Sequence, residues 1–136
     1  YNDTQRKMVE DANWMQNLPT FWENEQVAVC HAGLCKPHRH PSTMSDNLRL
    51  WARDPRFMSS GPYEVDKPVI FGHTPRDRIQ IYPHALGVDT ACVFGGYLTA
   101  AIVEDDVPFD PQTATIIQVR LNSRELDAQP VEIKLG

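Results

Sequence analysis

Two short apolar segments of this 136-residue chain lead directly to a histidine. Residues 27–30 run into His31, and residues 69–71 run through Gly72 into His73. Short runs of β-branched and aromatic residues are typical of buried strands, and a loop just beyond such a strand can aim a side chain from a rigid scaffold. Because neutral imidazole is a good ligand for Mn, Fe or Zn, the matched contexts favour one metal ion held by both histidines. The alternative is that each histidine is a polar residue that simply ends its strand.

Composition limits the classes of function. The net charge of −5 gives no global attraction to nucleic acid or to an anionic membrane, so neither is predicted as a partner. No apolar run approaches the ~18 residues of a membrane span, and no signal peptide is visible. Three cysteines without a framework spacing favour thiols, with Cys30 and Cys92 buried in apolar runs. These features predict a cytoplasmic protein.

Four motifs follow one another in a family-specific order. They are H-A-G at 31–33, L-W-A-R at 50–53, F-G-H-T-P at 71–75 and G-V-D-T-A-C-V-F-G-G-Y-L-T-A at 87–100. Together they closely resemble the calcineurin-like metallophosphoesterases. More narrowly, they resemble the bacterial phosphoprotein phosphatase (PPP) group and the symmetrical diadenosine tetraphosphatases. The resemblance covers residues 18–103, which is most of the chain.

The resemblance also shows what the chain does not contain. In that family the motifs G-D-x-H, G-D-x-x-D-R-G and G-N-H-E precede H-A-G, and none of them occurs here. We therefore expect residues 1–136 to be the carboxyl-terminal part of a single metallophosphoesterase domain. The expected fold is mixed α and β, the carboxyl-terminal half of a four-layer β-sandwich flanked by helices. The missing amino-terminal half is the expected partner, and the isolated chain is expected to be inactive.

By resemblance, the site uses two divalent metal ions, expected to be Mn, with Fe or Zn as alternatives. His31 and His73 would then ligate the same one of the two ions. Arg53 matches the family arginine that grips the substrate phosphate, and a guanidinium suits this role because its planar fork of donors matches two phosphate oxygens. The alternative for Arg53 is a surface pair with Asp46 or Asp54.

The G-V-D-T segment adds one further candidate and two departures from the family. Asp89 is a third metal ligand or, the preferred interpretation, a residue that positions the loop. Ala91 stands where the family usually has glycine, and Tyr97 stands where a basic residue is common.

The resemblance implies a phosphoester hydrolase. The leading hypothesis is a phosphomonoesterase of the protein serine/threonine phosphatase type, acting on a phosphorylated protein or a small phosphate ester. L-W-A-R-D, with Arg53 retained, favours it over the alternative, hydrolysis of diadenosine tetraphosphate at the same centre. A non-catalytic fragment that binds phosphate or a partner is the hypothesis from a different class.

The remaining helix and strands are predicted from the spacing of apolar residues and from the residues that interrupt it. Residues 2–18 predict an amphipathic helix whose Met8, Trp14 and Met15 pack in the core. Strands are predicted at 21–23, 79–82, 85–88, 97–103, 115–121 and 131–135, the last as an edge strand.

The loop 34–47 carries Cys35, His38 and His40. The interpretations are a zinc site, a basic rim over an anionic pocket, or a plain solvated loop. The spacing matches no common structural-zinc pattern, so the solvated loop is preferred. His84, in the turn between two predicted strands, is given no role.

Overall fold

The computed structural model describes residues 2–35, 40–53, 65–120 and 129–136. The elements in chain order are α1 (Asp3–Gln16), β1 (Phe21–Glu23), β2 (Ala28–Cys30), the 3₁₀ helix η1 (Pro41–Thr43), α2 (Asp46–Trp51), β3 (Val69–Phe71), β4 (Gln80–Tyr82), β5 (Ala85–Gly87), the 3₁₀ helix η3 (Cys92–Phe94), β6 (Tyr97–Ile102), β7 (Thr115–Arg120) and β8 (Val131–Lys134). The helix and all the strands expected from the sequence are confirmed, to within one or two residues at their ends.

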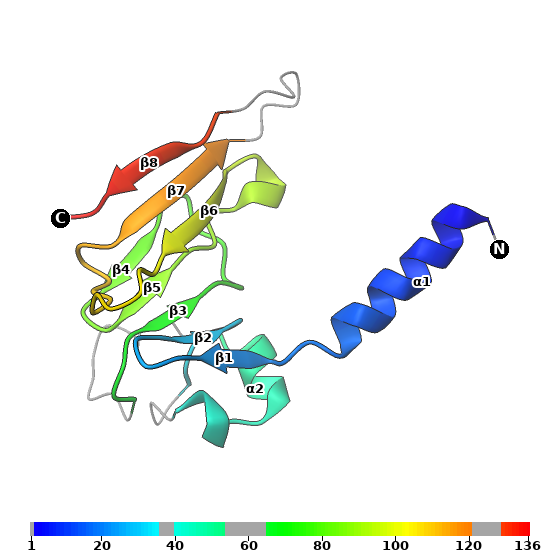
Figure 1. Cartoon of the computed structure of the whole chain (residues 1–136), viewed down its shortest axis with the longest axis horizontal. Helices are drawn as coiled ribbons and strands as arrows, with labels where there is room; N and C mark the ends of the chain where they lie inside the picture. Colours follow the sequence, from blue (N-terminus) through cyan, green and yellow to red (C-terminus); the bar gives the residue numbers. More distant parts are fainter. Residues whose placement is uncertain (1, 36–39, 54–64, 121–128) are drawn as a thin grey trace.

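The strands form two sheets (Figure 1). The first sheet has the order β1-β2-β3-β5-β4, with β2, β3 and β5 parallel to one another and an antiparallel strand at each edge. The second sheet, β6-β7-β8, is antiparallel, and β8 is the predicted edge strand. Alternation along each parallel strand sends successive side chains to opposite faces of the first sheet, so both faces need apolar cover.

Each face of the first sheet belongs to its own apolar cluster. On one face, Val69 and Phe71 of β3 pack with Leu34 and Met44 from the segment around η1. On the other face, Leu86 of β5 packs against Ile116 of β7 and its neighbours. Leu86 and Ile116 are fully buried, and they join the two sheets. Two packed sheets with few helices confirm the mixed α and β class, whereas the four-layer arrangement stays a prediction.

Helix α1 has a well-formed amino terminus. The Asn2 side chain accepts a hydrogen bond from the backbone N–H of Gln5, and the Gln5 side chain accepts one from the backbone N–H of Asn2. This reciprocal capping satisfies two of the amide donors that a helix start leaves without partners. The predicted helix is therefore confirmed, and Asn2 is its cap.

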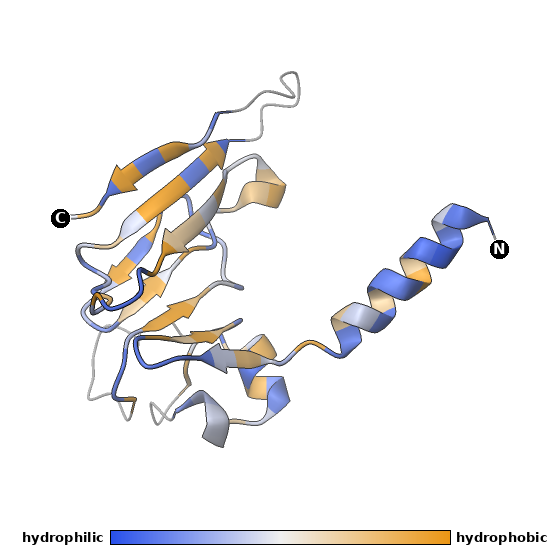
Figure 2. Cartoon of the chain, viewed as in Figure 1, coloured by the Kyte–Doolittle hydropathy of each residue, from blue (hydrophilic) through white to orange (hydrophobic). Residues whose placement is uncertain are grey.

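The predicted packing of α1 is wrong. The helix buries none of its residues, and it projects away from the two sheets in Figure 1. Met8, Trp14 and Met15 are each about two-thirds exposed. In Figure 2 the helix shows separate apolar patches among hydrophilic residues, in contrast to the largely apolar central strands. Helical spacing sets which side chains share a face, but it does not supply a surface for that face to pack on.

None of the helices in the described part of the chain has the length and apolar character needed to span a membrane.

Candidate metal centre

The two histidines meet because β2 and β3 are parallel neighbours. Cys30 pairs with Phe71 in the register of these strands, so the residues that follow leave the sheet at the same edge. The backbone N–H of Gly72 continues the ladder by donating to the His31 carbonyl over 2.9 Å. His73 comes next and takes a left-handed backbone conformation, with φ of 66°. Such a conformation is strained in a non-glycine residue and often marks a functional position.

The imidazole rings of His31 and His73 are in direct contact. His31 Nε2 lies 3.1 Å from His73 Nδ1. The ring centroids are 4.9 Å apart, and the ring planes are tilted by 60°. The predicted convergence of the two side chains is therefore present in the structure.

The other ring nitrogen of His73 has no hydrogen-bond partner in the part of the chain that the structure describes. His73 Nε2 is buried, and no donor or acceptor reaches it among the described residues. If Nδ1 carries the proton, Nε2 has an unused lone pair; if Nδ1 accepts from His31, Nε2 has an unused N–H. Buried polar atoms are almost always paired, so a nitrogen left orphaned beside a second imidazole fits a metal ligand.

The electrostatics of His73 fit the same role. Burial lowers the pKa of His73, the positive charges of His31 and Arg53 lower it further, and Asp89 acts in the opposite direction. A lowered pKa keeps the imidazole neutral near pH 7, and the neutral form is the one that binds a metal. The donor set is nevertheless incomplete, because the described residues contain no group of three or more His, Cys, Asp or Glu side chains arranged to hold a metal ion.

Arg49 fixes α2 against the edge that carries the histidines. Its guanidinium donates to Thr20 Oγ1, to the carbonyls of Pro41 and Met44 and to Asp46, at 2.6–2.7 Å. Its own carbonyl accepts the backbone N–H of Ala32, next to His31, at 2.8 Å. Arg49 therefore joins α2, η1 and the end of β2. No pattern in the sequence indicated this role.

Arg53 follows α2 by two residues and is exposed. Its charge lowers the pKa of His73, so it lies within electrostatic reach of the histidine pair. Asp46 pairs with Arg49 instead, and hydrogen bonds from Thr20 and then Arg49 lower the pKa of Asp46. Asp54, the other carboxylate considered for Arg53, lies outside the described residues. Phosphate binding by Arg53 stays a prediction.

Trp51, the last residue of α2, is a neighbour of the site that sequence reasoning missed. Its ring meets the His73 ring edge to face, with centroids 5.8 Å apart and planes at 89°. The signal in the sequence was the spacing of Trp51 and Arg53. Two residues this close at the end of one short helix can reach the same site.

The segment after β5 links the two sheets beside the site. Asp89 Oδ1 accepts the backbone N–H of Ala91 at 3.1 Å, and the Asp89 carbonyl accepts that of Arg76 at 3.1 Å. These contacts are consistent with the preferred, positioning role of Asp89. Buried Thr90 donates to the Tyr97 carbonyl at the start of β6. A Cβ on Gly96 would lie 2.1 Å from the Thr90 carbonyl oxygen, so only glycine fits there.

Ala91 and Tyr97, the two residues that depart from the usual motif pattern, pair with each other at the link between the sheets. Ala91 has φ of 61°, a left-handed conformation that glycine adopts at lower cost, which explains the usual family residue. The Tyr97 ring receives the Arg120 guanidinium at 5.7 Å from its centroid. Residue 91 therefore carries backbone strain, whereas the side chain of Tyr97 contacts Arg120.

The other described histidines, His40 and His84, make contacts outside the histidine pair. His40 caps η1 through Ser42 and contacts Glu23 Oε2 at 3.1 Å, and His84 contacts the Val65 carbonyl at 3.1 Å. His38 lies outside the described residues, so the zinc interpretation stays untested. Burial raises the pKa of the Cys30 thiol as expected for a buried thiol, whereas Cys92 is only partly buried on η3.

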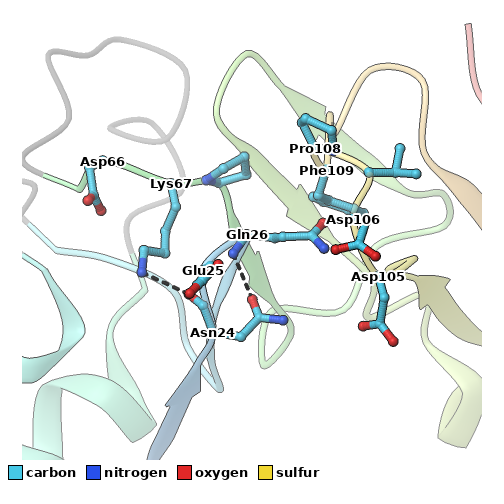
Figure 3. Close-up of a pocket in the computed structure, with 11 residues that line it drawn as sticks. Asn24, Glu25, Gln26, Asp66, Lys67, Asp105, Asp106, Pro108 and Phe109 are labelled. Carbon is cyan, nitrogen blue, oxygen red and sulfur yellow. Dashed lines mark hydrogen bonds between the residues drawn. The ribbon is translucent and has the colours of Figure 1, made fainter.

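A separate cavity of about 720 Å³ lies where the strands of the first sheet begin, away from the histidines. Figure 3 shows side chains from three segments around it: 24–26, 66–68 and 105–109. Lys67 Nζ donates to the Asn24 carbonyl and contacts Glu23, and Gln26 Nε2 donates to the Glu104 carbonyl. The lining carries carboxylates without the imidazole pair, so this cavity does not belong to the candidate metal centre.

Comparison with known proteins gave three short matches. An asymmetrical bis(5'-nucleosyl)-tetraphosphatase PrpE of Halalkalibacterium halodurans is 47% identical over 38 residues, 28% of this chain and 15% of the relative. A symmetrical bis(5'-nucleosyl)-tetraphosphatase of Janthinobacterium is 37% identical over 51 residues, 38% of this chain and 19% of the relative. PrpE of Geobacillus thermodenitrificans is 42% identical over 38 residues, 28% of this chain and 16% of the relative.

No family model matches the chain. The matched segments span less than a fifth of the length of each of these relatives. The relatives belong to the calcineurin-like metallophosphoesterase superfamily, so the resemblance seen in the motifs is supported in part. Over short segments, this chain is similar to hydrolases that act on phosphate compounds.

Proposed function

We propose that this chain supplies part of the active site of a metal-dependent phosphoester hydrolase. The observation that carries the proposal is the contact between His31 and His73, with His73 Nε2 buried and without a partner among the described residues. Two neutral imidazoles at one sheet edge are a suitable but incomplete ligand set for a divalent metal.

Residues of this chain would bind both a metal ion and the substrate phosphate. His31 and His73 would hold one metal ion, with Mn expected and Fe or Zn as alternatives. Bound divalent metal supplies a nucleophilic water at neutral pH and neutralises charge on the phosphoryl group. Arg53, exposed beside the pair, orients the phosphate with its planar fork of donors. Arg49 and the Gly72-to-His31 hydrogen bond keep these side chains in register.

The rest of the centre comes from elsewhere in the protein. Hydrolysis with two metals needs further carboxylate, amide and imidazole ligands, and the described residues provide only the histidine pair. We place the missing ligands, the second metal and the proton donor for the leaving group in an amino-terminal half outside these 136 residues.

The comparisons favour the second of the two substrate hypotheses. All three relatives are named as bis(5'-nucleosyl)-tetraphosphatases, so a dinucleoside tetraphosphate is the preferred substrate. A phosphorylated protein or small phosphate ester remains the second candidate. It is favoured by Arg53, which in its W-x-R context suits a terminal phosphate.

The experiment compares these substrates on the full-length protein. Hydrolysis of diadenosine tetraphosphate, a phosphoserine peptide and p-nitrophenyl phosphate is measured with Mn²⁺, Fe²⁺ or Zn²⁺ added, alongside metal content by mass spectrometry. We expect metal-dependent hydrolysis that is fastest with the tetraphosphate. Metal-independent turnover, or no turnover and no bound metal under any condition, would overturn the proposal. Residues 1–136 alone are expected to be inactive in the same assay.

A further inference from the structure

Trp51 stands at the edge of the candidate metal centre with most of its side chain open to solvent. The residue is 64% exposed, and its ring contacts the His73 ring at 5.8 Å. Exposure by itself needs no explanation, because single apolar side chains are common on protein surfaces. Trp14 is equally exposed, at 65%, but it lies on α1, which buries none of its residues. Position, not exposure, sets Trp51 apart.

The geometry of the contact leaves a ring face available. His73 and Trp51 meet at 89°, so one ring presents its edge to the other. Such a contact uses at most one face of the indole, and at 64% exposure of the residue much of its surface is accessible to solvent. Aromatic rings bind flat partners by stacking on such a face.

The backbone that carries Trp51 is held in place. Arg49, two residues earlier, is bonded to Thr20, to the carbonyls of Pro41 and Met44 and to Asp46. The backbone N–H of Ala52 closes α2 on the Leu48 carbonyl at 3.1 Å. Arg53, a phosphate-binding group under the proposed function, follows directly. An anionic group bound beside His73 and Arg53 would therefore lie close to the Trp51 indole, whose centroid is 5.8 Å from that of the His73 ring.

We propose that Trp51 is a specificity-determining residue, a platform on which the nucleobase next to the bound phosphate stacks. This inference rests on the proposed function. It adds a residue that selects phosphate compounds carrying an aromatic base over equivalent compounds without one. Stacking on an aromatic side chain tolerates any base, because every base has a π face.

The test separates recognition of the base from recognition of the phosphate. Adenosine 5'-monophosphate and ribose 5-phosphate carry the same phosphate and pentose, and only the first has a base. Their binding to the full-length protein with Mn²⁺ is measured by isothermal titration calorimetry. We expect wild type to prefer the nucleotide about tenfold, Trp51→Leu to lose that preference with ribose 5-phosphate affinity unchanged, and Trp51→Phe to keep part of it.

Trp14→Leu is the matched control, because it removes an equally exposed indole from α1, and it should keep the full preference. Mn²⁺ affinity is measured in every variant, since it would fall if Trp51 served only to hold His73. A Trp51→Leu protein that still prefers the nucleotide, or that loses both ligands equally, overturns the inference while the proposed function stands. If the wild type binds neither ligand and no Mn²⁺, the phosphate site does not exist, and the proposed function is overturned as well.

Discussion

Two regions of the molecule, helix α1 and the sheet edge with the two histidines, are held together by different kinds of contact. The edge is held by contacts between residues far apart in the sequence, such as Gly72 to His31 and Arg49 to Thr20. The hydrogen bonds of α1 all join residues within one turn of each other. Both regions have a clear sequence pattern. Among the described residues, the edge is packed against neighbouring segments, whereas α1 buries none of its residues. The following predictions probe this difference.

The largest effect is expected at the histidine pair. His31→Ala or His73→Ala removes one of two imidazole ligands, so metal content should fall and hydrolysis should drop by orders of magnitude in the full-length protein, while the fold survives. Mass spectrometry and kinetics check this. His84→Ala, outside the site, is the control and should keep its metal. Full metal content and activity in both site variants would rule out the assignment.

Arg49→Met tests how the edge is held together. The variant leaves the carbonyls of Pro41 and Met44 without their charged donor, so the free energy of unfolding should fall by about 3 kcal/mol. Urea unfolding measures the change. Arg6→Met on exposed α1 removes a guanidinium that pairs with Asp3 at the surface and should change stability by less than about 0.5 kcal/mol. Equal effects of the two variants would contradict the comparison.

Arg53→Lys keeps the charge beside His73 but loses the planar fork. Transition-state stabilisation should fall by roughly 1.5–3 kcal/mol, the scale of a charge-assisted hydrogen bond. Steady-state kinetics with p-nitrophenyl phosphate provide the measurement, with Arg78→Lys as the exposed-arginine control. Wild-type kinetics for Arg53→Lys would return Arg53 to the role of a surface residue.

Ala91→Gly should stabilise the link between the two sheets. Ala91 has φ of 61°, and relief of this strain, less the entropy that glycine adds to the unfolded chain, is worth about 0.5–1 kcal/mol. Ala100→Gly, on an exposed position of β6, should have the opposite sign. Denaturant midpoints compare the two. A loss of stability in Ala91→Gly would mean that the alanine methyl group contributes packing there.

The smallest effect is expected on α1. Met8→Gln and Met15→Gln keep helix propensity and remove exposed apolar area, so each should change stability by less than about 0.5 kcal/mol. Leu86→Ala, in the core between the sheets, should cost about 2–5 kcal/mol in the same urea experiment. A loss of more than about 1 kcal/mol from either methionine variant would show that α1 packs against a surface beyond the described residues.

Much of the secondary structure followed from the sequence because it depends on local patterns. The apolar runs before His31 and His73 became β2 and β3, and Asn2 became the cap of α1. The convergence of the two histidines was predicted from their matched contexts, but it also requires that the two strands be parallel neighbours, which the sequence pattern does not show.

Other features depend on which segments meet in space. The sequence could not show that Arg49 would join α2 to η1 and the end of β2, or that Trp51 would lie against His73. Burial of Met8, Trp14 and Met15 was predicted wrongly for the same reason, since their spacing does not reveal whether a partner surface exists.

The sequence by itself determined the strands, the helix cap and the two histidines at strand ends, because propensity and periodicity act over a few neighbouring residues. The tertiary structure alone decided that β2 and β3 are parallel neighbours, which places His31 Nε2 3.1 Å from His73 Nδ1 and leaves His73 Nε2 buried without a partner among the described residues. Strand pairing and burial depend on contacts between residues more than 40 positions apart, and no local pattern encodes them.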